Sequence, residues 1–188
     1  MRGLFAVCML VFLLSGCNAT PRVPDVLDVN IASLVTSGGQ QLPPVRMEIK
    51  DQRTHSHVLR VEHHQDHAEF ATTASPLATL ISRELSSYWF FSAQSPIKMT
   101  LYIEDALIRV EHIDRTYQTN HNISLRLEGE HQNQSIIRRY QTIVTGAPLS
   151  APDYQRMQTS FNQGLADTLT QLLNDDELRQ WLIQQSTR

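Results

Sequence analysis

Apolar side chains follow one another without interruption from Leu4 to Leu14, and Arg2 carries the only charged side chain before them. A membrane-spanning helix needs about 20 consecutive apolar residues. This run is shorter and is followed by small residues, a pattern typical of a cleaved signal peptide. We therefore predict that residues 1–16 form a signal peptide that the mature chain lacks.

Alternation of apolar and polar residues predicts strands in the first half of the remaining chain. Residues 27–31 alternate between two stretches rich in proline and glycine, which predicts a short strand at a sheet edge. Residues 45–50 predict a half-buried strand. Residues 58–61 and 68–72 predict a hairpin that turns near residues 64–66.

Apolar residues spaced by three and four predict helices elsewhere. Ser75 and Pro76 supply an N-cap hydroxyl and a proline suited to the first helical position, so we predict a helix over residues 76–92. A second amphipathic stretch begins at Pro152. Residues 174–177 combine an N-cap residue with acids in the first turn, which predicts that a short helix restarts there.

Three further strands are predicted between the helices. Residues 97–103 are apolar at odd positions, whereas residues 106–110 are apolar at even positions. A one-residue change of phase within a strand is what a β-bulge produces, so we predict a bulge at residues 104–105. Residues 123–127 and 136–144 complete the predicted meander.

The order of these elements predicts an α+β fold. We expect a two-layer structure in which a mainly antiparallel sheet has two helices packed on one face. The predicted domain spans residues 45–188. Residues 17–44 are predicted to be a tether that contains a short edge strand.

The stretch Leu14-Ser15-Gly16-Cys17 resembles the lipobox of bacterial lipoproteins. The resemblance implies that Cys17 forms a thioether to a lipid, and two or more acyl chains hold a protein stably on a membrane. Asn18 stands where an Asp would resemble an inner-membrane retention signal, so we predict an outer-membrane protein facing the periplasm. The alternative is an ordinary secretory signal followed by a chance cysteine.

Composition excludes several classes of protein. The chain has two cysteines, and neither Cys8 in the signal peptide nor the lipidated Cys17 leaves a thiol for a disulfide. The net charge of −3 lacks the basic character of a nucleic-acid binder. We predict no nucleic-acid partner, no second membrane span and no cofactor.

The ordered set of motifs resembles the YajG family of bacterial lipoproteins. The resemblance rests on the lipobox, Asp51-Gln52-Arg53-Thr54, the helix after Ser75, the meander, and a polar last helix with Asn162, Ala166-Asp167 and Trp181-Leu182-Ile183-Gln184-Gln185. It covers nearly the whole mature chain. It implies an outer-membrane lipoprotein and assigns no molecular activity.

Five histidines lie in a short acidic stretch and form the clearest candidate metal site. Imidazole binds zinc, copper or nickel when three or four ligands converge. Residues of a hairpin can converge in this way, and the candidate ligands are His55, His57, His63, His64 and His67. The alternative is a solvated polar hairpin that happens to be rich in histidine.

Asp51 and Arg53 lie two residues apart at the end of a predicted strand, where their side chains share a face. Arg53 could bind an anionic ligand. The favoured alternative is a structural ion pair between the two side chains.

Motifs of catalysis are missing from the sequence. It contains no G-x-S-x-G elbow and no glycine-rich phosphate loop. Glu104 and Asp105 are adjacent in a strand, so we expect them to face opposite sides. We therefore predict a non-enzymatic accessory protein of the envelope, whose partner is an envelope protein or an apolar ligand. A periplasmic metal binder is the alternative.

Overall fold

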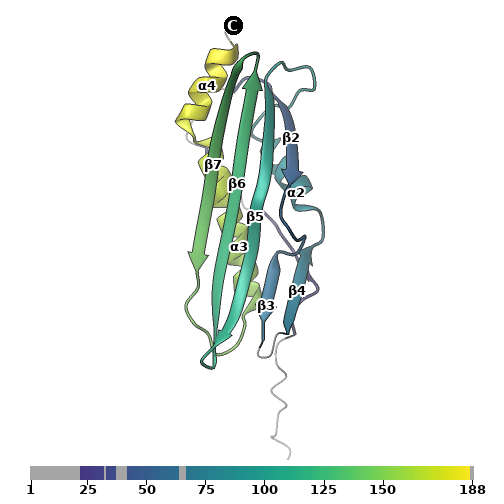
Figure 1. Ribbon diagram of the computed structural model, residues 1–188, viewed down its shortest axis with the longest axis vertical. Helices are drawn as coiled ribbons and strands as arrows, with labels where there is room; N and C mark the ends of the chain where they lie inside the picture. Colours follow the sequence, from purple (N-terminus) through teal and green to yellow (C-terminus); the bar gives the residue numbers. More distant parts are fainter. Residues whose placement is uncertain (1–21, 32, 37–41, 64–66, 187–188) are drawn as a thin grey trace, which may run out of the picture.

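The computed structural model describes residues 22–31, 33–36, 42–63 and 67–186. These residues form a seven-stranded open sheet and three helices (Figure 1). The strands are β1 (Val26–Leu27), β2 (Arg46–Asp51), β3 (Leu59–Glu62), β4 (Ala68–Thr73), β5 (Lys98–Ile113), β6 (Thr116–His131) and β7 (Gln134–Thr145). The helices are α2 (Leu77–Leu85), α3 (Tyr154–Leu173) and α4 (Asp176–Ser186).

The sheet is mixed rather than mainly antiparallel. The meander β5–β6–β7 and the hairpin β3–β4 are antiparallel, as their short connections require. Both β2 and β3 run parallel to β5, and β1 runs parallel to β4. Alternation along one strand does not specify the direction of its neighbour, so the sequence could not predict these parallel pairs.

Strand β5 has two neighbours along one side. Its first half pairs with β2, and its second half pairs with β3. The register against β6 shifts between Ile103 and Asp105, which confirms the predicted bulge. The bulge therefore lies in the part of β5 that pairs with neither β2 nor β3.

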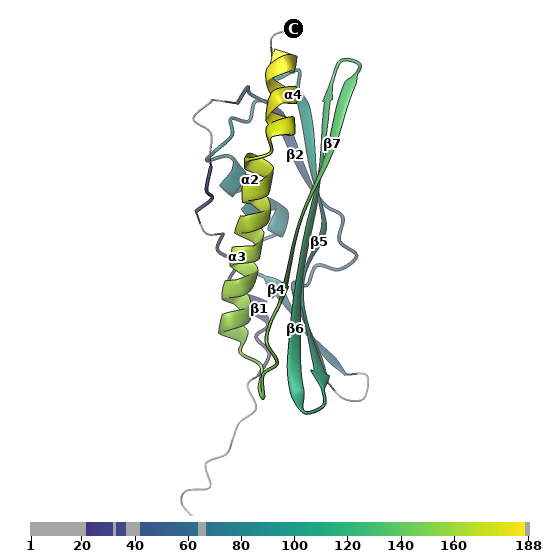
Figure 2. The ribbon, with the colours of Figure 1, turned by 90° about the vertical axis from the view of Figure 1, so that its left-hand side faces the viewer.

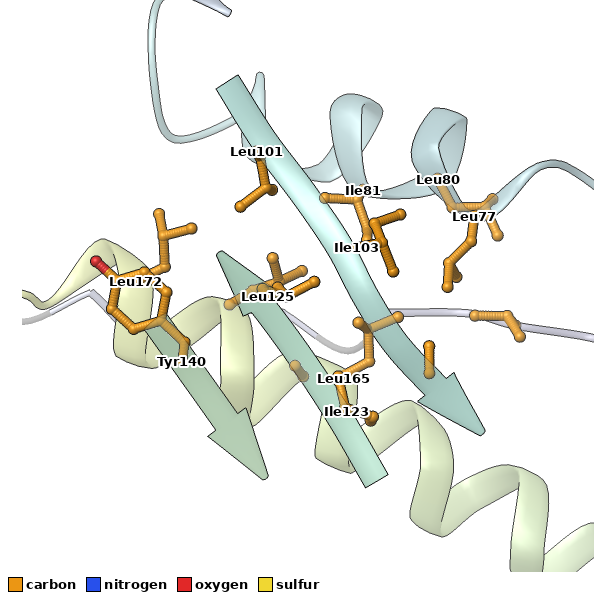
Figure 3. Packing of buried hydrophobic residues seen from close by; sticks show 14 of the residues in the cluster. Leu77, Leu80, Ile81, Leu101, Ile103, Ile123, Leu125, Tyr140, Leu165 and Leu172 are labelled. Atoms are coloured by element: carbon orange, nitrogen blue, oxygen red, sulfur yellow. The ribbon is translucent and has the colours of Figure 1, made fainter. Parts of the chain in front are cut away.

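The three helices lie on one side of the sheet (Figure 2). Helix α3 contacts β6 and β7, α2 contacts β2, and α4 contacts β7. Figure 3 shows apolar side chains of the sheet and helices meeting in one cluster, among them Ile81, Leu125 and Leu165. Among the described residues, no helix combines the length and apolar character needed to cross a membrane.

Helix α2 is shorter than the predicted helix over residues 76–92. It ends at Leu85 because the next residues turn and then pair with another segment. Val45 donates its N–H to the carbonyl of Phe90 and accepts a hydrogen bond from the N–H of Ser92. The backbone at Phe91 is thus extended rather than helical, as its bridge to Val45 requires.

Part of the predicted tether over residues 17–44 is packed on the domain. Val23, Leu27, Val29 and Leu34 are buried and belong to the same core cluster as the sheet. The backbone of this segment also bonds to α3, since Asp28 donates its N–H to the Gln158 side chain at 3.3 Å. The folded unit therefore includes residues before the predicted boundary at 45.

Candidate functional site

A cavity of about 180 Å³ lies between the sheet and the first turns of α3. Its sheet wall comes from β6 and from the end of β7, and its other wall comes from α3. It adjoins an open groove of about 590 Å³ between β7 and α3. Val144, Asp153, Arg156 and Ser160 line both, so the groove leads to the cavity.

His121 is the buried polar side chain of this cavity. It is 3% exposed, and its Nδ1 atom has no hydrogen-bond partner. Burial lowers the pKa of His121 to about 4, so the ring is neutral at neutral pH. A neutral imidazole carries one donor and one acceptor. An unsatisfied buried polar atom costs about 1–3 kcal/mol, which a bound hydrogen-bonding group would recover.

The cavity has an apolar floor and a charged mouth. Met157 is buried at 3% exposure and faces the cavity, while Arg156 is exposed at its rim. Asp153 caps α3 by accepting the N–H of Arg156 at 2.9 Å. This arrangement suits a small molecule with an apolar body, a hydrogen-bonding group near His121 and an acidic group near Arg156.

Gly146 closes one side of the cavity. Its N–H donates to the carbonyl of Thr119 at 2.9 Å, which brings the two backbones together. A Cβ atom at this position would overlap Oγ1 of Thr119. A residue with a side chain at position 146 would therefore require the Thr119 side chain, which lines the cavity, to move.

The histidines predicted to form a metal site do not converge. The two predicted strands pair, because β3 and β4 are antiparallel and His63 donates its N–H to the carbonyl of His67, whereas the predicted turn at residues 64–66 lies outside the described residues. His55 stacks on His57 before β3, whereas His63 stacks on His67 after it. The length of β3 separates the two pairs, which corrects the expectation of one cluster.

Neither histidine pair completes a metal site among the described residues. Within this part of the chain, no group of three or more His, Cys, Asp or Glu side chains is placed to hold a metal ion. His63 lies 3.8 Å from the Glu69 carboxylate, and His57 packs against Phe70. His64 lies outside the described residues.

Asp51 and Arg53 form an ion pair. The guanidinium of Arg53 donates to both carboxylate oxygens of Asp51, at 2.9 and 2.7 Å. It also donates to the carbonyls of His57 and Ala106, at 3.3 and 3.2 Å. The Arg53 side chain is only 6% exposed, and it bridges β2, the segment that precedes β3, and β5 beside the bulge. The geometry is that of a structural arginine with its donors engaged by the protein.

The expectation that Glu104 and Asp105 face opposite sides is wrong. The bulge adds a residue to β5 and turns both side chains to the outer face. Glu104 accepts from Arg126 at 2.6 Å, and Asp105 accepts from Asn122 at 2.7 Å. Each carboxylate is thus held by a residue of β6.

Comparison with known proteins decides the family. A family model described as "uncharacterized lipoprotein" (Lipoprotein_16) matches residues 36–183. The chain belongs to this lipoprotein family. The predicted resemblance to the YajG family of uncharacterised lipoproteins is confirmed. No curated protein sequence matches the lipoprotein.

A solved structure shares the fold of the lipoprotein. A crystal structure of a Xanthomonas campestris protein from the family DUF330 is similar with a TM-score of 0.55 and 12% identity. The match covers 87% of the lipoprotein and 99% of that chain. A second crystal structure, of an uncharacterized protein, has 21% identity, a TM-score of 0.40 and coverage of 71% and 94%. At this level of identity the first similarity shows the fold alone.

The sequence predicted a site at Cys17 that the structure does not describe, whereas the structure reveals a site at His121 that the sequence did not predict. Cys17 precedes both the described residues and the matched range 36–183, so lipidation at this position stays a prediction. His121 was missed by the sequence analysis. The alternation of Ile123, Leu125 and Leu127 in β6 places His121 on the same inward face, and this phase was the available signal.

Proposed function

We propose that this lipoprotein is a non-enzymatic accessory protein of the outer membrane that binds a small, largely apolar ligand. Lipid on Cys17 would hold the domain on the periplasmic side of the membrane. The ligand would lie in the cavity beside His121. The observation that carries the binding role is the unpartnered Nδ1 atom of His121 in a cavity that Val144, Leu149 and Met157 line with apolar side chains.

The position of the cavity supports this proposal. A chain running from Cys17 to the buried Val23 spans at most about 20 Å, whatever its conformation. The segment that follows lies against the first turns of α3, where Asp28 bonds to Gln158 (Figure 2). An anchor at Cys17 would therefore keep this half of the molecule, which includes the cavity, close to the bilayer.

Replacing Cys17 tests the anchor. Cys17→Ser removes the only proposed acceptor of lipid, so we expect the variant to lose incorporation of a labelled fatty acid and to leave the membrane fraction. Cys8→Ser is the matched control, because that residue lies within the predicted signal peptide. Asn18→Asp is expected to move the protein to the inner-membrane fraction. Membrane sorting with lipid labelling in Cys17→Ser would refute the anchor.

Native mass spectrometry of the full lipoprotein, purified in a mild detergent, tests ligand binding. We expect a bound organic mass in the wild-type protein. His121→Phe keeps the ring volume and removes the hydrogen-bonding atoms, so occupancy should fall about tenfold. His55→Phe, remote from the cavity, should retain the mass. A wild-type spectrum that shows the lipidated chain with no added mass would contradict ligand binding. An added mass that a chelator removes would indicate a metal instead.

A further inference from the structure

Strand β7 is a free edge of the sheet. Among the described residues it pairs with β6 alone, and it ends the strand order (Figure 1). It is 12 residues long. The N–H of Gly146 bonds to Thr119, so even-numbered residues of β7 direct their backbone groups toward β6. Odd-numbered residues from Ser135 to Thr145 therefore direct theirs toward the open edge, where another strand can pair.

The sequence of this strand is nearly symmetric about Tyr140. Reading outward from Tyr140, Arg139 matches Gln141, Arg138 matches Thr142, Ile137 matches Ile143, and Ile136 matches Val144. Two copies aligned antiparallel with Tyr140 at the centre would place each residue opposite its match. The odd-numbered pairs would then be the hydrogen-bonded pairs, which agrees with the direction of their free backbone groups.

The side chains of the edge fit this alignment. Ile137 and Ile143 are 58% and 60% exposed, and both lie on the outer face of β7. The alignment would pair Ile137 of each copy with Ile143 of the other and remove apolar surface from water.

No two like charges would lie directly opposite each other. Arg138 would face Thr142 and already bonds to Asp175 at 2.7 Å in its own chain. Arg139 would face Gln141 and lies 3.8 Å from Glu104 of its own chain. Each arginine of the strand thus has a carboxylate near it in its own copy, and the Arg139 side chains of the two copies would lie diagonally rather than directly opposite each other.

We propose that two copies of this lipoprotein associate through antiparallel pairing of their β7 strands about a twofold axis at Tyr140. The sheets of the two copies become one continuous sheet. The groove between β7 and α3 runs along the same edge and includes Val144 and Gly164. This interface is independent of the ligand proposed for the cavity.

Paired cysteines test both the partner and the register. The mature chain has no cysteine besides Cys17, which is the predicted site of lipid. In the dimer, Cα atoms of a hydrogen-bonded pair lie about 5.5 Å apart, a distance that a disulfide can bridge. The double variant Ile137→Cys, Ile143→Cys should therefore form a covalent dimer in the oxidising periplasm.

The single variants are the matched controls for crosslinking. Each position lies far from the same position in the second copy of the dimer. The single variants Ile137→Cys and Ile143→Cys should therefore stay monomeric on a non-reducing gel. Co-expression of the two single variants should restore the covalent dimer. The pair Ile137→Cys, Gln141→Cys corresponds to a slip of two residues and should not crosslink.

Native mass measurement provides a second test on the full lipoprotein. The wild type should be a dimer, Ile143→Lys should be a monomer, and Ile113→Lys, an exposed position on β5, should remain a dimer. A folded double-cysteine variant that forms no covalent dimer would overturn the proposal. So would crosslinking by the single variants alone, or a different protein captured at this edge.

Discussion

Replacing Asp175 with alanine should lower the free energy of unfolding by about 3 kcal/mol. The Asp175 side chain is 6% exposed and connects β7 to α4. One carboxylate oxygen caps α4 by accepting the N–H groups of Glu177 and Leu178, at 3.0 and 3.1 Å. The other accepts from Arg138 at 2.7 Å and from the Tyr140 hydroxyl at 2.8 Å. Alanine would leave both N–H groups and the Tyr140 hydroxyl without this acceptor and would leave Arg138 with Glu177 alone. Urea unfolding measures the loss of stability.

Asp176→Ala is the control for this prediction, because Asp176 is the next acid along the chain and is exposed. We expect its effect to stay below about 0.5 kcal/mol. Asp175→Asn keeps the helix cap and sets an amide N–H₂ group against the donors of Arg138. Its loss of stability should therefore lie between those of Asp176→Ala and Asp175→Ala. Equal unfolding curves for Asp175→Ala and the wild type would contradict the role assigned to this carboxylate.

The same carboxylate predicts how stability depends on pH. Burial raises the pKa of Asp175, but the Leu178 N–H, the Tyr140 hydroxyl and Arg138 outweigh burial and hold the pKa below its ordinary value of 3.8. A carboxyl group with a lowered pKa stabilises the fold above that ordinary value. Its contribution is lost as the pH falls below 3.8 and through the lower pKa of the folded state. The difference in stability between wild type and Asp175→Ala should therefore shrink in acid.

Replacing Arg53 with methionine should lower the free energy of unfolding by about 2–3 kcal/mol. Methionine keeps the length and apolar stem of the side chain. It removes the donors to Asp51 and to the carbonyls of His57 and Ala106, which face the gap between β2 and β3. We expect amide exchange to accelerate mainly in β2 and β3, because this gap is where both strands leave β5.

Two variants separate the shape of the Arg53 guanidinium from its charge. Arg53→Lys keeps the charge and loses the planar set of donors. We expect it to lower the free energy of unfolding by about half as much as Arg53→Met does. Lys50→Ala removes an exposed cation that lies 3.2 Å from Glu48 and should change stability by no more than about 0.5 kcal/mol. Equal losses for Arg53→Met and Lys50→Ala would show that Arg53 has no special role.

Signals within short stretches of the sequence determined where several strands, the bulge and the start of α4 lie. The change of apolar phase after Ile103 predicted the bulge, and two short alternating runs close in sequence predicted that β3 and β4 pair as a hairpin. The N-cap residue and the acids at residues 174–177 predicted the restart that became α4, and the structure shows that Asp175 is the residue that caps it. Each of these signals lies within a few residues of the structure that it specifies. The family resemblance likewise depended on local motifs and their order.

Contacts between residues far apart in the sequence decided how the strands pair and which side chains come together. Alternation shows that a strand has an apolar face, but it does not show that β2 and β3 share one side of β5. The separation of the His57 and His63 pairs follows from where the β3 strand lies between them. The burial of His121 became a candidate site only because α3 packs over that part of β6. Hydrogen bonding and packing across the sheet set these arrangements, and neither is encoded in any single segment.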